Sequence, residues 1–147
     1  ASYNKKFATQ LQIDLPKTCG QEINVVLSNS NIQFDPGKVI IKKSSELAIS
    51  SIANILRTCP KAKFEIQGHT DSSGSEGLNK NLSQSRAEAV LFELLNQRVL
   101  TSGIIAKGYG SINPIADNST DEGRETNRRI EFKLIETLKT DSGDQAS

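Results

Sequence analysis

The chain has 147 residues, the size of one ordinary domain, and folding at this size buries about two thirds of the surface of the extended chain. Its 18 basic and 17 acidic residues are spread along the sequence, so we expect no binding to nucleic acid or to an anionic membrane surface. Hydrophobic residues make up 35% of the chain and Trp and Met are absent, so a core of aliphatic side chains and phenylalanine in a small α/β or α+β domain is expected.

The two ends of the chain are polar and show no apolar periodicity. We expect residues 1–17 and 137–147 to be flexible, and residues 18–136 to form one domain. No run of about 18 apolar residues occurs, and the first ten residues lack the apolar core of a signal peptide. Contact with a membrane is therefore expected only through segments outside this sequence.

Apolar residues at 23–27 predict a short helix or strand near the start of the domain. Residues 32–34 alternate as a strand does and are followed by the turn sequence at 35–37, which predicts a first core strand that ends there. Over 44–59 the apolar residues recur at helical spacing, with serines at the start and Pro60 after the end. This pattern predicts a helix with one apolar face.

Residues 63–67 alternate between polar and apolar side chains and predict a half-buried strand. Ser83 is expected to cap a second helix. The apolar stripe of that helix consists of Ala87, Val90, Leu91, Leu94 and Leu95. Residues 104–109 and 129–134 predict two further strands, with a short helical turn at 119–127 between them. The order β-α-β-α-β-(turn)-β predicts an α/β sandwich in which helices pack on a mixed sheet.

Asp71 and Arg86 are the first candidates for a binding site. If the second helix begins at Ser83, Arg86 falls in its first turn, where the helix dipole disfavours a cation by roughly a few tenths of a kcal/mol. A guanidinium beside the free N–H groups of a helix N-terminus suits a carboxylate, although a structural salt bridge explains Arg86 equally well. Asp71 follows a strand, where open α/β sheets tend to bind ligands. Together they suit a ligand with both an ammonium and a carboxylate group.

A hydrolase is the alternative that the segment 69–75 suggests, because it holds His69, Asp71, Ser72, Ser73 and Ser75. No G-x-S-x-G elbow surrounds these serines, and Glu76 is the only other acid near Asp71, so neither a catalytic triad nor a glycosidase pair is evident. We therefore expect His69 to be a structural residue and the chain to have no catalytic activity.

Cys19 and Cys59 are too few for a structural zinc site, and the single histidine lies within an unrelated pattern. We expect no metal and no cofactor. The pair permits either a disulfide or two buried thiols. A disulfide closing a loop of this length stabilises a fold by roughly 3 to 4 kcal/mol on the chain-entropy estimate.

Five segments resemble, in order and spacing, the C-terminal domain of the OmpA family. They are Gly68-His69-Thr70-Asp71, then NKNLSQSRA at 79–87, Gly108-Tyr109-Gly110, PIADN at 114–118 and GRETNRRIEF at 123–132. The resemblance covers roughly residues 32–135. The family includes OmpA-type porin tails, the peptidoglycan-associated lipoprotein and the stator protein of the flagellar motor.

The resemblance implies non-covalent binding of the peptide stem of peptidoglycan by a periplasmic domain that anchors the outer membrane or an envelope complex to the cell wall. Binding of another envelope protein is an alternative partner that stays open. In this family the end of the diaminopimelate side chain is held by an Asp and an Arg, which correspond to Asp71 for the ammonium and Arg86 for the carboxylate.

The same resemblance gives Asn79 and Arg128 supporting roles, as groups that border the pocket and bind the ligand or orient the clamp. Asp35 and Ser73 match loop positions near the same cleft, but either is equally a turn residue that bonds its own backbone. Regular alternation along the last strand would turn Arg129 away from Arg128.

The periplasmic location that the resemblance implies favours a disulfide between Cys19 and Cys59, because that compartment is oxidising. We then expect the segment 18–30, which the minimal family pattern lacks, to be a disulfide-pinned extension without chemistry of its own.

Overall fold

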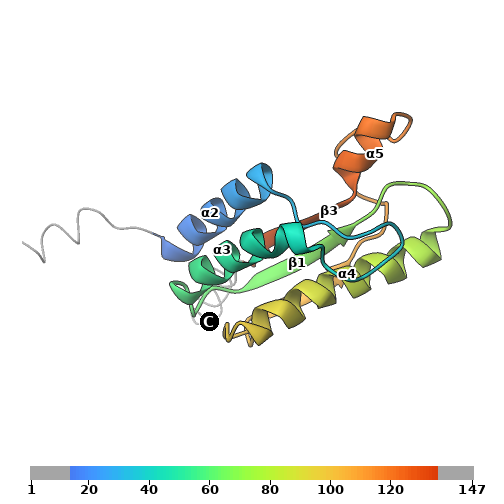
Figure 1. The fold of residues 1–147 in the computed structure, drawn as a ribbon. Helices are drawn as coiled ribbons and strands as arrows, with labels where there is room; N and C mark the ends of the chain where they lie inside the picture. Colours follow the sequence, from blue (N-terminus) through green and yellow to red (C-terminus); the bar gives the residue numbers. More distant parts are fainter. Residues whose placement is uncertain (1–13, 136–147) are drawn as a thin grey trace, which may run out of the picture.

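Four α-helices and three strands follow one another along residues 14–135, the part of the chain that the computed structural model describes (Figure 1). They are α2 (Leu15–Asn29), α3 (Glu46–Arg57), β1 (Phe64–His69), α4 (Glu76–Asn96), β2 (Ile104–Gly108), α5 (Asp121–Asn127) and β3 (Arg129–Leu134), with the short 3-10 helix η1 (Lys43–Ser45) ahead of α3. None of these helices is both long enough and apolar enough to cross a bilayer. Of the ends expected to be flexible, at 1–17 and 137–147, residues 1–13 and 137–147 lie outside the described residues.

Residues 23–27, for which either a helix or a strand was expected, lie in helix α2. This helix begins three residues before the domain boundary expected at Thr18. Its first turn contains Pro16, and the side chain of Asp14 caps it by accepting a hydrogen bond from the backbone N–H of Lys17 at 3.2 Å. Ile23 is fully buried on its inner face. The additional N-terminal segment is thus a capped helix that contributes to the core.

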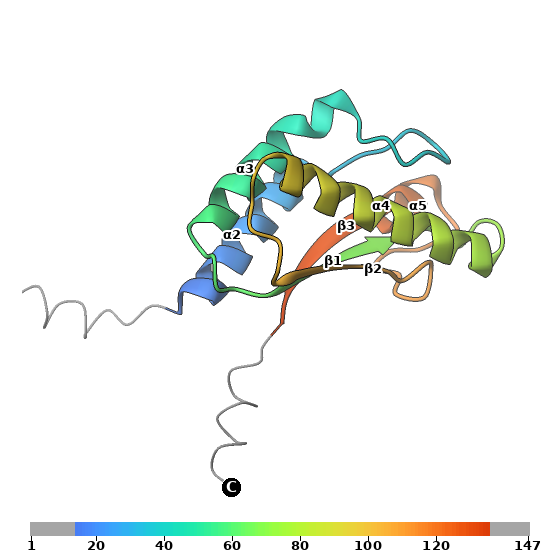
Figure 2. The ribbon, with the colours of Figure 1, turned by 90° about the horizontal axis from the view of Figure 1, so that it is seen from below.

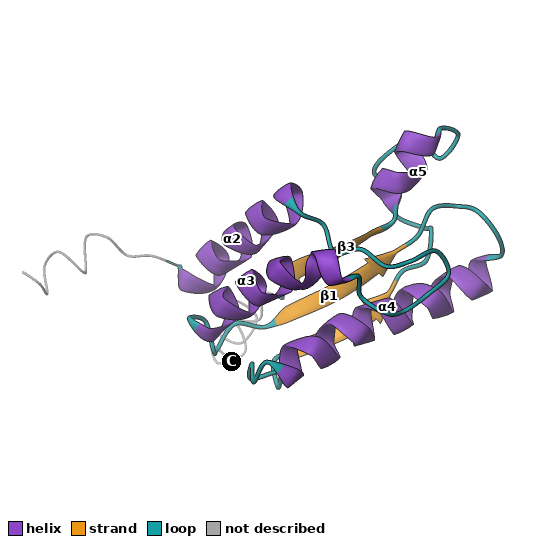
Figure 3. Cartoon of the chain, in the orientation of Figure 1, coloured by secondary structure: helices purple, strands orange, loops and turns teal. Residues whose placement is uncertain are grey.

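The three strands form one sheet in the order β2-β1-β3, with β1 parallel to β2 and antiparallel to β3. Phe64 pairs with Ile104 on one side and Leu134 on the other, and this register places the buried apolar residues of all three strands on the same face. Helices α2, α3 and α4 pack along that face (Figures 2 and 3). The expected α/β class with a mixed sheet is confirmed.

The other face of the sheet is polar. Tyr109 donates a hydrogen bond to Glu65 at 2.5 Å, and the Lys107 ammonium lies 5.0 Å from the Tyr109 ring centroid. On β3, Glu131 forms ion pairs with Arg129 and Lys133. These partners satisfy each other, so this face does not require a second helical layer.

The strand expected at residues 32–34 is wrong, because it is reduced to an isolated bridge between Phe34 and Ile41. The backbone N–H of Gln33 donates instead to the Ser45 hydroxyl at 2.8 Å, and Ile32 inserts into the core. The chain then turns at Asp35, whose carbonyl accepts from the N–H of Lys38. The alternation of apolar and polar residues at 32–34 arises because Ile32 is buried and Phe34 partly buried in a loop. The sheet therefore has one strand fewer than expected.

The start of the second helix was also predicted wrongly. Helix α4 begins seven residues before Ser83, where the Ser75 hydroxyl caps it by accepting from the N–H of Leu78 at 3.2 Å. Ser83 is instead fully buried in mid-helix, where its hydroxyl donates to the Lys80 carbonyl and accepts from the N–H of Gly110. The polar first turns of α4 concealed its beginning. Of the expected stripe, Leu95 is exposed.

Helix α4 lies directly against the sheet at two glycines. A Cβ at Gly68 would overlap the backbone oxygen of Ser83, and a Cβ at Gly108 would overlap the backbone of Gln84. The side chain of Gln84 also accepts a hydrogen bond from the N–H of Gly108 at 2.8 Å. The contact fixes the height of α4 above the ends of β1 and β2.

A Gly68→Ala substitution is expected to destabilise the fold by about 2 to 3 kcal/mol, because backbone atoms of α4 must move to admit the methyl group. Gly77→Ala is the matched control, since a Cβ there meets open space within the first turn of α4. This control should stabilise the protein by up to about 1 kcal/mol. Urea denaturation of both variants measures the difference, and equal stabilities would contradict the close-contact account.

Candidate functional site

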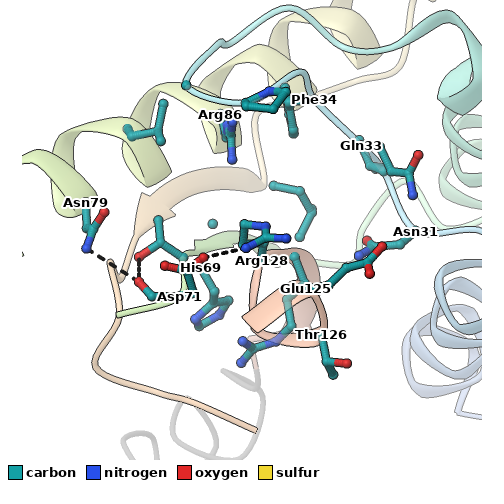
Figure 4. A pocket seen from close by; sticks show the side chains of 18 of the residues that line it. Asn31, Gln33, Phe34, His69, Asp71, Asn79, Arg86, Glu125, Thr126 and Arg128 are labelled. Carbon is teal, nitrogen blue, oxygen red and sulfur yellow. Dashed lines mark hydrogen bonds and ion pairs between the residues drawn. The ribbon is translucent and has the colours of Figure 1, made fainter. Parts of the chain in front are cut away.

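A groove of about 1010 Å³ lies at the end of the sheet where β1 leads into Asp71 and α5 leads into β3. Its walls come from the loop at 31–42, from α4 and from α5. In Figure 4, Asn79 lies at one side of this pocket and Asn31 at the other, with Arg128 between them. Elements far apart in the sequence therefore meet around one cavity.

Asp71 lies at the base of the groove and is largely buried. One carboxylate oxygen accepts from the backbone N–H of Ser73 at 2.7 Å, and the other pairs with the Arg128 guanidinium at 2.5 Å. Burial raises the pKa of Asp71, but these hydrogen bonds outweigh burial and hold the pKa below its ordinary value. The carboxylate is therefore charged at neutral pH.

Arg86 reaches the groove from the eleventh residue of α4 and not from a first turn, so the expected unfavourable dipole interaction does not arise. Its Nε donates to the Lys38 carbonyl at 2.8 Å, its Nη2 donates to the Asp35 carbonyl at 3.1 Å, and its guanidinium lies 4.9 Å from the Phe34 ring centroid. Burial and the nearby charge of Arg128 lower the pKa of Arg86. Within residues 14–135 this buried cation has no carboxylate partner.

The two adjacent arginines before and in β3 point to different places. Arg128 is half-exposed and forms the ion pair with Asp71. Arg129 is buried, pairs with Glu131, and donates to the carbonyls of Asn127 and Asn113 at 3.0 and 2.9 Å. The structure thus places Arg128 at the charged centre of the groove, while Arg129 braces the polar face of the sheet.

Asn79 and Ser73 shape the loop that carries Asp71. Asn79 lies on α4 and donates to the Ser73 carbonyl at 2.9 Å and to the Asp71 carbonyl at 3.4 Å. The backbone N–H of Ser73 donates to the Asp71 carboxylate at 2.7 Å. Asp35 contributes its carbonyl to Arg86, whereas its exposed carboxylate lies 3.8 Å from the Lys42 ammonium. The structure therefore brings the first two together at Asp71 and keeps the Asp35 side chain apart.

Sequence reasoning missed Phe34, Gln33 and Thr126, whose side chains border the groove (Figure 4). The sequence did contain an indication for Phe34. An aromatic residue directly before a turn sequence is usually buried against a neighbouring element. Its partner Arg86 lies 52 positions later, so the cation–π contact is not readable from local pattern.

His69 is a structural residue in this geometry. Its ring stacks on Tyr109 with centroids 5.4 Å apart, and its Nε2 lies 3.1 Å from the Gln67 side-chain oxygen. Burial, aided by the charge of Arg129, lowers the pKa of His69 to about 4. Among the described residues, no hydrogen bond joins its ring to a serine hydroxyl.

The groove is lined by three arginines and three acidic residues, which are Arg86, Arg128, Arg129, Asp71, Glu122 and Glu125. Such a set can hold a ligand that carries a carboxylate for Arg86 and an ammonium for Asp71. Across residues 14–135, no group of three or more His, Cys, Asp and Glu side chains is placed to bind a metal ion. The charged side chains that line the groove suit recognition of a charged ligand.

Comparison with known proteins shows the same family throughout. The model of the OmpA family matches residues 33–128, which is more than half of the chain. The probable lipoprotein YiaD of Escherichia coli (strain K12) is 39% identical over 112 residues, which cover 76% of this chain and 51% of that protein. The peptidoglycan-binding protein ArfA of Mycobacterium tuberculosis (strain H37Rv) is 40% identical over 110 residues, or 75% of this chain and 33% of that protein.

Among solved structures, the peptidoglycan-associated lipoprotein from Burkholderia pseudomallei aligns with a TM-score of 0.68 and 26% identity, covering 75% of this chain and 93% of that one. The chain spans about half of YiaD and a third of ArfA. These matches confirm the resemblance of the five sequence segments, and they show that this chain belongs to the OmpA family.

Proposed function

We propose that this domain binds peptidoglycan non-covalently and anchors an envelope protein to the cell wall. The observation that carries the proposal is the buried Arg86 guanidinium, which faces the groove beside Asp71 and has no carboxylate partner within residues 14–135. A buried cation is stabilised when an anion completes its contacts. Membership of the OmpA family, and the cell-wall ligand in the name of ArfA, support peptidoglycan as its source.

The ligand that suits the charges is the side-chain end of diaminopimelate in the peptide stem. This group carries an ammonium and a carboxylate on one carbon. The carboxylate binds the free edge of the Arg86 guanidinium, and the ammonium binds Asp71, where it shares the carboxylate with Arg128. Asn79 and the backbone at Ser73 hold the Asp71 loop in place, while Asp35 contributes only its carbonyl.

The location that follows is the periplasm, in association with the outer membrane. The names of relatives support this placement, since they include a probable lipoprotein and outer membrane porins. The domain needs no catalytic group for this role. The groove fits an anchor, because Asp71 and Arg86 are held in fixed positions by hydrogen bonds.

Purified sacculi test the proposal directly. The protein should co-sediment with sacculi and release no soluble fragments, whereas a hydrolase would release them. A free stem peptide that ends in meso-diaminopimelate should compete for binding, and the same peptide with lysine in that position should not. In the lysine peptide the α-amino group is in a peptide bond and the side-chain end lacks a carboxylate, so no carbon carries both charges. Fragment release, or equal competition by the lysine peptide, would overturn the proposal.

A further inference from the structure

One side-chain oxygen connects the chain on both sides of the Asp71–Arg128 ion pair. Asn118 Oδ1 accepts a hydrogen bond from Asn127 Nδ2 at 2.8 Å and from the backbone N–H of Ser72 at 3.4 Å. Ser72 directly follows Asp71, and Asn127 directly precedes Arg128. The chain neighbours of both charged residues are therefore held by the same atom.

Asn118 is itself held firmly, because Asn127 ties the loop before α5 to the end of that helix. Asn127 is fully buried, and its Oδ1 accepts from the N–H groups of Ile115 and Ala116 at 2.7 and 2.9 Å. Its Nδ2 donates to the Ala116 carbonyl at 3.0 Å as well as to Asn118. All the donors and acceptors of this amide are used, so residues 115–128 behave as one block.

The Asp71 loop has few other links to this block. Among the described residues, two hydrogen bonds join the segment 71–75 to residues 113–128. One is the Asp71–Arg128 ion pair, and the other is the contact of Ser72 with Asn118. When a ligand ammonium competes with Arg128 for Asp71, the Asn118 contact is the link that remains.

We propose that Asn118 is a positioning residue of the binding site, whose side-chain oxygen sets the separation of Asp71 and Arg128. The inference rests on the proposed function of the groove. Only the acceptor of the Asn118 amide is used, because its Nδ2 makes no hydrogen bond to any part of residues 14–135. An aspartate at this position keeps that acceptor, whereas a leucine of similar size removes it.

The experiment compares three variants in the whole chain. Asn118→Leu should weaken binding of a diaminopimelate-containing tripeptide by roughly three- to ten-fold, the effect of losing about one hydrogen bond from a positioned site. Asn118→Asp should bind within about two-fold of the unsubstituted protein. Asn113→Leu is the matched control, since its exposed side chain lies in the same loop and it contributes only its carbonyl to Arg129. Calorimetry measures binding, and circular dichroism shows that each variant is folded.

A second readout separates positioning from a general loss of stability. With Arg128 less closely held, the pKa of the Asp71 carboxyl should rise toward its ordinary value in Asn118→Leu and stay low in Asn113→Leu, measured by NMR titration. Unchanged affinity in Asn118→Leu, or an Asn118→Asp variant as weak as the leucine variant, would overturn the inference. If Asp71→Asn still binds the tripeptide, the proposed function fails as well, which distinguishes the two results.

Discussion

Substituting Arg86 by alanine should abolish detectable co-sedimentation with sacculi. Removing one partner of a desolvated charge pair weakens binding by about 2 to 5 kcal/mol, or roughly thirty- to several-thousand-fold. The loss is expected at the upper end, because the Arg86 guanidinium also holds the carbonyls of Asp35 and Lys38 and contacts Phe34. This one substitution removes the group that binds the carboxylate of the ligand. It also removes the hydrogen bonds that hold the loop at Asp35 and Lys38 against the groove.

The matched control for this experiment is Arg57→Ala. Arg57 also donates to a backbone carbonyl, that of Gln97, and to the side chain of Asn54, but it lies outside the groove. This variant should lose similar hydrogen bonds and keep full binding. Asp71→Ala should match Arg86→Ala, since it removes the partner of the ligand's ammonium. The clamp assignment is wrong if either groove variant still binds sacculi like the control.

Removing the disulfide between Cys19 and Cys59 should produce the largest loss of stability. The bridge joins α2 to the residues that follow α3, with Cα atoms 6.7 Å apart and a sequence separation of 40. Closing a loop of this length stabilises the folded state by about 4 kcal/mol on the chain-entropy estimate. A Cys19→Ala, Cys59→Ala double variant should therefore unfold about 10 to 20 °C lower in a thermal scan.

The stability that the disulfide contributes has to be separated from the stability that packing of the two side chains contributes, because both cysteines are almost completely buried. The double alanine variant loses the bridge and also some apolar contact. A Cys19→Ala single variant loses the bridge but keeps the Cys59 side chain, so its stability should already show most of the drop. If the single and double variants both melt within about 2 °C of the unsubstituted protein, the bridge contributes little.

Elements with a regular apolar period were predictable from the sequence. Helix α3 and strands β1 and β3 lie within two residues of their expected bounds, because each has one buried face whose spacing is visible in the chain. The beginning of α4 was not predictable in this way. Residues 76–82 have only two apolar side chains, and Leu78 is exposed, so the helix there is stabilised by the Ser75 cap and its contact with the sheet.

The site was predictable only in part. Resemblance to a family pointed to residues that the fold brings to one groove, among them Asp71, Arg86 and Arg128. The links between them were hidden, because the contact of Asn118 with Ser72 spans 46 positions and depends on a backbone N–H, which carries no sequence signal. The role of the Asp35 carbonyl was hidden for the same reason.

The polar groove and the two ends of the described chain lie at opposite ends of the sheet. Asp71 lies two residues after the end of β1, at the groove. Ile135 leaves β3 beside Lys63, just ahead of β1, and Cys19 of α2 is bonded to Cys59 near that same end of the sheet (Figure 1). Tension between a wall ligand held at Asp71 and the end of the described chain at Ile135 therefore runs lengthwise along β1 and β3. Their ladder hydrogen bonds are loaded in shear, all together, which resists force far better than opening them one after another.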